Sequence, residues 1–479
     1  MLPLVHNRRR AVVALATLLL VLLAGGVGAA PADPAGHWEG AVTLPGLELG
    51  LLVDLQLQDG VWSGTADIPM QGAKGIPLVG VRAVGDSLVF ALAGVPGEPT
   101  FRGVHADGVI TGDFTQQGRT FPFHLGREKL AAPNRPQEPK PPLPYREEEV
   151  GYDNGPIHLA ATLTLPEGTG PFPAAVLITG SGAQNRDEAL LGHRPFLVLS
   201  DYLTRAGIAV LRADDRGVGG STGKGRNSTT SDFADDALAG VRYLCTRPEV
   251  DRTRIGLIGH SEGGIVGPLA AARAPDEVAF VVMIAGTGVP LDEVILRQTE
   301  LIERAGGAAD SAVAAELGRT KLIMDLVKAG ADSAAVRAAL LRQIEAQLAA
   351  LPDSVRAAAG RPDDLADAAL AGMLNPWFRY AVGLDPRVAL RRLRCPVLAL
   401  NGTLDLQVDP DQNLPEIERA LREGGDRDVT VRRLPGLNHL LQRAQTGHPD
   451  EYARIEETMN EEALAAIRDW VRARFAGGR

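Results

Sequence analysis

A serine at the centre of a short glycine-flanked motif is the residue whose surroundings best fit covalent chemistry. Ser261 lies in the stretch "GHSEG" (259–263), which has the form G-x-S-x-G. An apolar run from Ile255 to Ile258 precedes the motif, and a second apolar stretch at helical spacing follows it. Flanking glycines permit the tight strand-to-helix turn that exposes a serine Oγ. The sequence therefore predicts that Ser261 is a nucleophile on such a turn.

A nucleophilic serine needs a general base and a carboxylate that orients the base, and candidates for both follow it in the chain. Asp405 comes just after the buried run "CPVLALNG", and His439 comes just after the run "VTVRRLPG". The carboxyl ends of strands are where an α/β sheet places its functional groups. Asp409 competes with Asp405 but lies further into its loop, and His448 does not follow a strand. We therefore predict Ser261, Asp405 and His439 as the catalytic residues.

Two backbone N–H groups are predicted to stabilise an oxyanion at this serine. One belongs to Glu262, which directly follows the nucleophile and lies at a helix N-terminus. The other belongs to the loop "TGSGAQN" after an early strand, where Ser181 is the predicted donor and Gly182 the alternative. With these groups the chain would cleave an acyl bond through an acyl-enzyme, and that chemistry requires no metal and no cofactor.

Alternating strands and helices are predicted to position these residues. Buried apolar runs such as "AAVLITGSG" and "VAFVVMIAG" alternate with helical stretches, as in an α/β sheet. The strand signal vanishes from about 290 to 386, where Ala- and Leu-rich amphipathic stretches predict a helical cap. Trp377, Phe378 and Tyr380 lie near the end of this cap. Trp377 and Phe378 are predicted to bind substrate, and packing of the cap against the core is the alternative.

The N-terminal part of the chain has a different organisation. Residues 1–32 combine "NRRR", a long apolar run and small residues, which predicts a signal peptide cleaved near Ala32 and export to the periplasm or the medium. An uncleaved membrane anchor is the alternative, and no stable membrane association is expected after cleavage. Residues 33–127 alternate with period two between glycine-containing turns, which predicts a small all-β sandwich or barrel. The Pro-rich residues 128–146 predict an extended linker. Residues 147–479 are predicted to form the catalytic domain.

Composition excludes several classes of function. A formal net charge of −10 argues against a nucleic-acid partner, because such binding depends on clustered Lys and Arg. Cys245 and Cys395 both fall in apolar patterns, so we expect two buried thiols and no disulfide. "GSGAQN" and "RGVGGSTG" each contain only part of G-x-G-x-x-G, which disfavours an NAD-dependent oxidoreductase. The sequence gives no prediction of oligomeric state.

Four stretches carry a resemblance to a known family: "DDRGVGGSTG", "GHSEGG", "NGTLDLQV" and "LPGLNHLLQ", in this order. With them the chain from about residue 145 to its end resembles the α/β-hydrolase superfamily, and within it the serine-aminopeptidase-like carboxylesterases that have an N-terminal β domain. The resemblance implies an α/β-hydrolase fold, a triad of Ser261, Asp405 and His439, and a helical cap over the active site. One departure is Thr179, where many relatives carry a histidine before the glycine of the oxyanion loop.

These observations predict an exported serine hydrolase that acts on small-molecule carboxylic esters, and the resemblance implies short or medium acyl groups. A serine aminopeptidase is the alternative enzyme, in which the Glu262 carboxylate would meet the amino group of a peptide. The competing interpretation of Glu262 is a charge favoured by the helix dipole. A non-catalytic binding protein is disfavoured because no member of the predicted triad is missing. For Arg216 in "DDRG" we favour a structural ion pair over a substrate contact.

Overall fold

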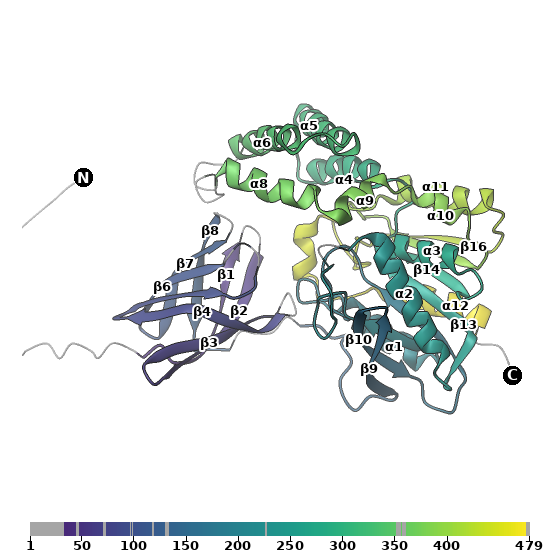
Figure 1. The fold of residues 1–479 in the computed structure, drawn as a ribbon, viewed down its shortest axis with the longest axis horizontal. Coiled ribbons are helices and arrows are strands. Elements are labelled where there is room, and N and C mark those ends of the chain that lie inside the picture. The colour runs from purple at the N-terminus through teal and green to yellow at the C-terminus, as the bar shows by residue number, and fades with distance from the viewer. Residues whose placement is uncertain are drawn as a thin grey trace, which may run out of the picture.

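The computed structural model of the protein consists of a β-barrel, a domain built on a mixed sheet, and a group of helices above that sheet (Figure 1). It describes residues 33–44, 47–69, 73–95, 97, 99–116, 119–129, 134–225, 228–350, 356 and 361–475. The predicted signal peptide, residues 1–32, lies outside the described residues. Within these ranges, no helix is both long enough and apolar enough to cross a bilayer.

Eight antiparallel strands form the barrel, which closes because its first strand pairs with both the second and the last. The strands are β1 (Gly36–Leu44), β2 (Leu47–Gln58), β3 (Val61–Ile68), β4 (Ala73–Val84), β5 (Ser87–Leu92), β6 (Thr100–Ala106), β7 (Val109–Gln116) and β8 (Arg119–Gly126). Alternate residues of a strand point to opposite faces, and the inward positions hold Trp38, Phe90 and Phe101. The all-β domain predicted from the sequence is therefore a barrel filled by its own side chains.

The segment that follows the barrel is bound to the sheet domain. The Arg135 guanidinium donates hydrogen bonds to four backbone carbonyl groups of that domain. Gln137 makes three more, with the backbone of Thr458 and Met459. The four acceptors of Arg135 are Leu191, Gly192, Ala453 and Ile455. Part of the Pro-rich stretch that the sequence predicts as a linker thus lies fixed on the surface of its neighbour.

The second domain is built on an eight-stranded sheet with the order β16-β15-β14-β13-β11-β12-β10-β9. The strands are β9 (Arg146–Asn154), β10 (Ile157–Leu165), β11 (Phe172–Ile178), β12 (Ala209–Ala213), β13 (Val250–His260), β14 (Phe280–Ile284), β15 (Val397–Gly402) and β16 (Val429–Leu434). The pairs β9/β10 and β10/β12 are antiparallel and the others are parallel. From β11 the chain moves to β12 on one side and then to β13 on the other, and open α/β sheets bind ligands at such a switch point.

Helices cover both faces of this sheet. Apolar side chains of α2, α3 and α11, such as Val241, Val266 and Ile417, pack on one face. Those of α1 and α12, such as Leu199 and Ile467, pack on the other. The bounds are α1 (Pro195–Arg205), α2 (Thr230–Cys245), α3 (Gly263–Arg273), α10 (Pro386–Leu390), α11 (Pro410–Glu423), η3 (Pro449–Arg454) and α12 (Glu461–Phe475). The two buried faces explain why the strands are near-continuous apolar runs.

Between β14 and β15 the chain leaves the sheet and forms the cap (Figure 1). Its helices are α4 (Leu291–Ala305), α5 (Asp310–Lys328), α6 (Ser333–Ala349), α8 (Pro362–Met373) and α9 (Pro376–Gly383). The cap has an apolar core of its own, which includes Ile323, Val336 and Leu340. Helix α9 contacts both α5 of the cap and α2 beside the sheet, and Arg297 of α4 bonds Asp409 at the start of α11, so both helices connect the cap to the domain below.

One prediction about the cysteines is wrong. Cys395 is buried as predicted, but Cys245 is exposed, and both thiols are free. Cys245 is the last residue of α2, and the residue before it, Leu244, takes the buried position. The next residue of a helix is turned by about 100°, which carries the Cys245 side chain away from the sheet. The α/β architecture with a preceding all-β domain is confirmed.

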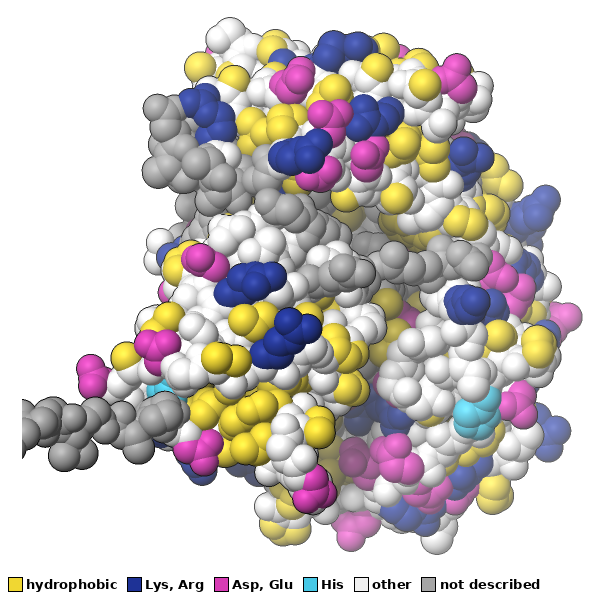
Figure 2. Space-filling view, turned by 60° about the vertical axis from the view of Figure 1, so that its left-hand side comes forward, with side chains coloured by type: hydrophobic (Ala, Val, Ile, Leu, Met, Phe, Trp, Pro, Cys, Tyr) yellow, Lys and Arg dark blue, Asp and Glu magenta, His cyan; other side chains and the backbone are white. Residues whose placement is uncertain are grey.

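The barrel carries most of the exposed large hydrophobic side chains of the described residues. Most of them lie near the turns that join β2 to β3, β4 to β5 and β6 to β7. The remaining two, Val79 and Val104, lie within β4 and β6. In Figure 2, which brings the barrel forward, yellow side chains gather on its surface. By exposed fraction, the large hydrophobic residues of the barrel surface are Leu57, Val61, Val79, Val84, Val104 and Val109.

Candidate functional site

Ser261 lies on a sharp turn between β13 and α3. Its φ of +54° is in the left-handed region, which is strained for a residue with a side chain. Its amide donates a hydrogen bond to the carbonyl of Ile284 at 2.8 Å. A Cβ on Gly259 would lie 2.0 Å from the carbonyl oxygen of Gly263, and one on Gly263 would lie 2.1 Å from that of Ile178. The two glycines of the motif are therefore required by close approach of backbone, and the turn exposes the serine between them.

The three residues predicted as catalytic form one hydrogen-bonded chain. His439 Nε2 lies 3.2 Å from Ser261 Oγ, and His439 Nδ1 lies 2.8 Å from Asp405 Oδ2. Asp405 is 1% exposed, and its other oxygen accepts from the amides of Gln407 and Val408 at 2.8 Å each. A fixed carboxylate at Nδ1 selects the tautomer in which Nε2 can accept a proton from the serine. This is the geometry of an activated nucleophile.

A second carboxylate–histidine pair, Glu188 and His260, lies next to the hydrogen-bonded residues Ser261, His439 and Asp405. His260 Nδ1 is 2.9 Å from Glu188 Oε1, and His260 Nε2 lies 3.1 Å from the carbonyl oxygen of His439. Glu188 Oε1 also accepts from the amide of Gly180 at 2.6 Å. Burial alone would lower the pKa of His260, but the charge and hydrogen bond of Glu188 outweigh it and raise that pKa. The pair links the nucleophile turn, the loop after β11 and the loop that carries the base.

The two amides predicted to bind an oxyanion both lie beside the serine. Glu262 follows it directly, at the N-terminus of α3. Ser181 follows Gly180, on which a Cβ would lie 3.4 Å from Ser261 Cβ, so the loop after β11 touches the turn. Neither the Ser181 amide nor the Glu262 amide donates a hydrogen bond to another described group. Gly182, the alternative donor, has a φ of +102°. Two free N–H groups next to the serine are suited to stabilise negative charge.

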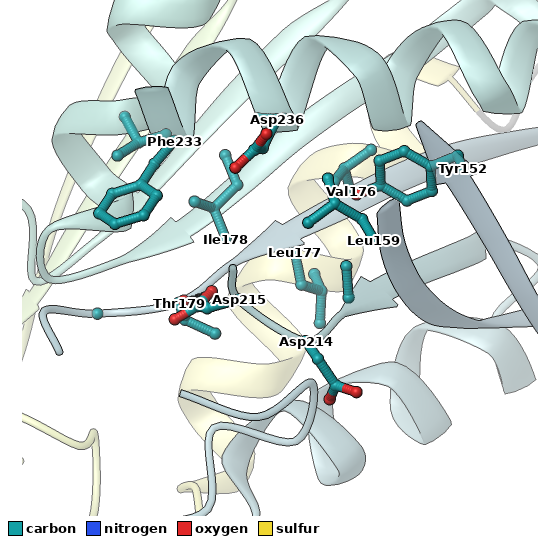
Figure 3. Close-up of a pocket in the computed structure, with 14 residues that line it drawn as sticks. Tyr152, Leu159, Val176, Leu177, Ile178, Thr179, Asp214, Asp215, Phe233 and Asp236 are labelled. Atoms are coloured by element: carbon teal, nitrogen blue, oxygen red, sulfur yellow. Dashed lines mark hydrogen bonds between the residues drawn. The ribbon is translucent and has the colours of Figure 1, made fainter. Parts of the chain in front are cut away.

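Thr179, which departs from the family pattern, is hydrogen-bonded to a buried aspartate. Its Oγ1 donates to Asp215 Oδ1 at 2.8 Å, and the amide of Gln184 donates to Asp215 Oδ2 at 2.9 Å. Figure 3 shows Thr179 and Asp215 close together beside a small cavity of about 50 Å³. Burial raises the pKa of Asp215 to about 8, and the charges of Glu188 and Glu262 act in the same direction. Asp215 therefore connects both ends of the loop that carries Ser181.

The Glu262 carboxylate does not point into solvent as a simple helix-dipole charge. It is 8% exposed, and its Oε1 accepts from Thr230 Oγ1 and from Trp377 Nε1, both at 2.7 Å. Burial raises the pKa of Glu262, and the two hydrogen bonds oppose that shift. Both hydrogen bonds end on Oε1, and Glu262 also belongs to the wall of the cavity that contains Ser261. The Glu262 side chain thus connects Trp377 of the cap with Thr230 of α2 in the sheet domain.

A cavity of about 250 Å³ opens onto Ser261, His439 and Ser181. Trp377 and Phe378, the two residues predicted to bind substrate, both belong to its wall. Phe378 also packs in the core of the cap itself, which differs from the packing of the cap against the hydrolase core that is the alternative interpretation. The remaining walls are chiefly apolar and include Ile265, Val289, Val294, Ile295, Leu384 and Val408. The lining suits an apolar group bonded to the reacting carbonyl or to its leaving oxygen.

The other candidates from the sequence have structural partners. Asp409 caps α11 through the amide of Asp411 and accepts a hydrogen bond from Arg297 of the cap at 2.6 Å. Asp405, not Asp409, is the carboxylate that bonds His439. Arg216 pairs with Asp236 of α2. Among the residues that the structure describes, no group of three or more His, Cys, Asp or Glu side chains is placed to hold a metal ion.

Sequence reasoning missed the side chains that support the site. His260 occupies the variable position of G-x-S-x-G, and Glu188 lies in the loop after β11, beyond the residues predicted to bind the oxyanion. Thr230 is the first residue of a helix, where a hydroxyl is unremarkable. An ionisable residue at the variable position of the motif was the one available signal, because a histidine buried there needs a partner.

Comparison with known proteins places this fold and site in a family. The model of the alpha/beta hydrolase family matches residues 175–455. The chain is 28% identical over 284 residues to esterase EstD of Thermotoga maritima, a match that covers 59% of this chain and 58% of that protein. It is 30% identical over 142 residues to acyl-coenzyme A thioesterase 1 of Mus musculus, 30% of each chain. The chain thus spans well under two thirds of either relative.

Among solved structures, Est1E from Butyrivibrio proteoclasticus with ferulic acid bound is similar to 68% of this chain and 96% of its own, with 18% sequence identity and a TM-score of 0.40. The family match covers more than half of the chain and includes the nucleophile turn, the cap and the loops of Asp405 and His439. The α/β-hydrolase fold predicted from the sequence is confirmed. This protein belongs to the alpha/beta hydrolase family.

Proposed function

We propose that the protein is a serine carboxylesterase that hydrolyses small-molecule carboxylic esters through an acyl-enzyme. The observation that carries this proposal is the chain of hydrogen bonds from Asp405 through His439 to Ser261 Oγ, at the floor of a largely apolar cavity. The relative EstD, which is named an esterase, supports the same class of reaction. Export of the mature chain, expected from residues 1–32, is part of the proposal.

In the first half of the reaction, His439 Nε2 accepts the proton of Ser261 Oγ while the oxygen attacks the ester carbonyl carbon. The carbonyl oxygen becomes an oxyanion, which the Glu262 and Ser181 amides stabilise. When the tetrahedral intermediate collapses, the bond to the alcohol oxygen breaks and the imidazolium returns its proton to that oxygen. The free alcohol leaves, and the acyl group remains esterified to the serine.

In the second half, a water molecule gives a proton to His439 Nε2 and its oxygen attacks the acyl carbon. The second tetrahedral intermediate uses the same two amides. Its collapse breaks the bond to Ser261 Oγ, which recovers its proton from the imidazolium, and the carboxylic acid leaves. Asp405 stabilises the imidazolium in both halves and does not itself exchange a proton.

A serine aminopeptidase is the competing activity, and the surroundings of Glu262 argue against it. An aminopeptidase must hold a substrate ammonium group, and the Glu262 carboxylate is buried with Thr230 and Trp377 as its partners. Burial also raises its pKa, which weakens it as an anion. The two neutral donors on Oε1 and the raised pKa both weaken Glu262 as an anchor for an ammonium group, so we favour the ester over the peptide.

The test compares 4-nitrophenyl esters of increasing acyl length with aminoacyl-4-nitroanilides. We expect the esters to be hydrolysed, the anilides to resist, and Ser261→Ala to abolish turnover. Ser311→Ala, at an exposed serine of α5, is the matched control and should behave like the parent. A preference for anilides would establish the aminopeptidase instead. Turnover of esters by Ser261→Ala at the parent rate would overturn the assignment of the nucleophile.

A further inference from the structure

Tyr452 of η3 is a buried tyrosine that the proposed mechanism does not use. It is 2% exposed, and its hydroxyl accepts a hydrogen bond from Gln407 Nε2 at 3.1 Å. The backbone amide of Gln407 in turn donates to Asp405 Oδ1 at 2.8 Å. Burial raises the pKa of Tyr452, and hydrogen bonds from Gln407 and from the backbone of His439 oppose that shift. The hydroxyl thus lies between the loop of Asp405 and the loop of His439.

A second buried side chain joins the segment of Tyr452 to the loop of the base. The His193 imidazole is 0% exposed, and its Nε2 lies 2.9 Å from the Tyr452 carbonyl oxygen and 3.0 Å from Gln442 Nε2. Gln442 Oε1 accepts from Asn438 Nδ2 at 2.9 Å, and Asn438 directly precedes His439. Burial lowers the pKa of His193 to about 4, so this imidazole is neutral at neutral pH. The loop of His439 is therefore connected through His193 to the segment of Tyr452.

Arg135, in the segment that follows the barrel, holds both parts of this network. Its two Nη atoms donate to the carbonyl groups of Ala453 and Ile455 at 3.0 and 2.8 Å, just after Tyr452 in the chain. Its Nε donates to the carbonyl of Gly192 at 3.0 Å, directly before the buried histidine. A planar guanidinium presents its N–H groups in a fixed fork, so it sets the distance between the groups that it bonds. One side chain outside the sheet domain thus fixes two segments that are far apart in the sequence.

We propose that Tyr452 is a positioning residue for Asp405 and His439, and that Arg135 holds Tyr452 in place, so that the segment between the two domains belongs to the scaffold of the active site. This inference rests on the proposed function and names side chains that support its reaction. Neither Tyr452 nor Arg135 belongs to the wall of the cavity around Ser261, so both act through other residues and not on the substrate. Loss of either should therefore change the reaction step more than substrate binding.

The first test compares the parent with Tyr452→Phe, which removes only the hydroxyl, on 4-nitrophenyl butyrate. Rates are expressed per mole of serine that reacts with a fluorophosphonate probe, so that unfolded protein does not lower the measured kcat. We expect kcat to fall by about tenfold and KM to change by less than about twofold, because the acid and the base are displaced while the cavity wall stays. The pH at half-maximal kcat should also fall, because a displaced carboxylate stabilises the imidazolium less.

The second test joins Arg135 to Tyr452. Arg135→Lys keeps the charge but replaces the planar fork with one ammonium group, which cannot bond both segments at once. We expect kcat to fall by about three- to tenfold, with the pH at half-maximal kcat moving in the same direction as in Tyr452→Phe. The double variant should lose less than the product of the two factors, because both substitutions act on the same segment. Factors that multiply would show that Arg135 does not act through Tyr452.

Two matched controls carry the same exchanges away from this network. Arg127 donates to the carbonyl groups of Ala35 and His37 at 2.8 Å each, so Arg127→Lys removes contacts of the same kind at one end of the barrel. Tyr145→Phe removes a hydroxyl that donates to Asp201 Oδ1 at 2.9 Å. Both controls should match the parent in kcat and in the pH at half-maximal kcat.

Three results would contradict the proposal in distinguishable ways. An unchanged kcat in Tyr452→Phe would overturn the positioning role and leave the esterase intact. A smaller amount of reactive serine, with parent values of kcat and of the pH at half-maximal kcat for each reactive serine, would mean that Tyr452 only stabilises the fold, and would overturn the role as well. Absence of ester hydrolysis by the parent would overturn the proposed function and this inference with it.

Discussion

Two carboxylate–histidine pairs lie beside the nucleophile in the folded chain, and they differ in the group that the second ring nitrogen of each histidine faces. In the Asp405–His439 pair, Nε2 lies 3.2 Å from a serine hydroxyl at the floor of a cavity. In the Glu188–His260 pair, Nε2 lies 3.1 Å from a backbone carbonyl and both nitrogens are used within the fold. Both pairs are buried, yet only the first leaves a nitrogen able to exchange a proton with a substrate.

The comparison teaches that burial and a carboxylate partner do not by themselves make a histidine a catalytic base. Glu188 raises the pKa of His260, and Asp405 fixes the tautomer of His439. Their roles differ because Nε2 of His439 faces the serine hydroxyl, whereas Nε2 of His260 faces a backbone carbonyl. The Glu188–His260 pair bonds the backbone at Gly180 and at His439, so it holds two loops that the reaction uses. Mutations in the two pairs should therefore act on different quantities.

The largest effect is expected from Asp405→Asn. The asparagine oxygen can still accept from the amides of Gln407 and Val408, but the amide nitrogen turned to His439 Nδ1 favours the tautomer with a proton on Nε2. That tautomer cannot accept the proton of Ser261, so kcat should fall by about 10⁴-fold. The measurement is kcat and KM on 4-nitrophenyl butyrate, with circular dichroism as the check on folding. A loss smaller than about tenfold would contradict the role given to Asp405.

Glu188→Gln breaks the supporting pair with little change of shape. The Gln oxygen can keep the hydrogen bonds to Gly180 and His260, but the negative charge that raises the pKa of His260 is gone. We expect kcat to fall by about 10- to 100-fold through misplacement of the loops, with a smaller change in KM. The free energy of unfolding should fall by about 1–3 kcal/mol.

The control for Glu188→Gln is Glu167→Gln, the same exchange at an exposed loop residue. It should leave both kcat and the free energy of unfolding at the parent values. A Glu188→Gln enzyme with the kcat of the parent would show that the charge on this pair is not needed to hold the loops.

The two pairs also mark how far sequence reasoning reaches. Asp405 and His439 were predictable because each comes soon after an apolar strand, and such a strand can be recognised from the sequence around it. Glu188 was not, because its contact with His260 spans 72 residues and depends on a loop residue with a φ of +51°. The exposure of Cys245 depends on which side of a helix meets the sheet, which a mixed apolar pattern does not fix.

Asp215→Asn should change the pH dependence of stability. The pKa of this carboxyl is about 8 in the folded chain against an ordinary value of 3.8, so between these values the folded state holds one more proton than the unfolded state. The free energy of unfolding of the parent should therefore fall as pH rises through this window, by up to about 1.4 kcal/mol per pH unit. The asparagine removes this titration, while its oxygen can accept from Gln184 and its amide can donate to Thr179.

Urea denaturation of parent and Asp215→Asn at about pH 5, 6, 7 and 8 is the measurement. The variant should gain stability relative to the parent with each step upward. Parallel curves for the two proteins would mean that the Asp215 carboxyl is already ionised in the folded chain at the lowest pH of the series.

The smallest effect is expected from Asp409→Asn, at the carboxylate that competes with Asp405 in the sequence. The asparagine side chain can still cap α11 through the amide of Asp411, and only the charge of the pair with Arg297 is lost. Partly exposed pairs of this kind contribute about 0–1 kcal/mol, so the free energy of unfolding should change little and kcat/KM should stay within about threefold of the parent. Assayed beside Asp405→Asn on the same ester, this variant separates a carboxylate that orients the base from one that holds the cap. An equal loss in the two variants would mean that the seating of the cap by Arg297 matters as much to the reaction as the tautomer of His439.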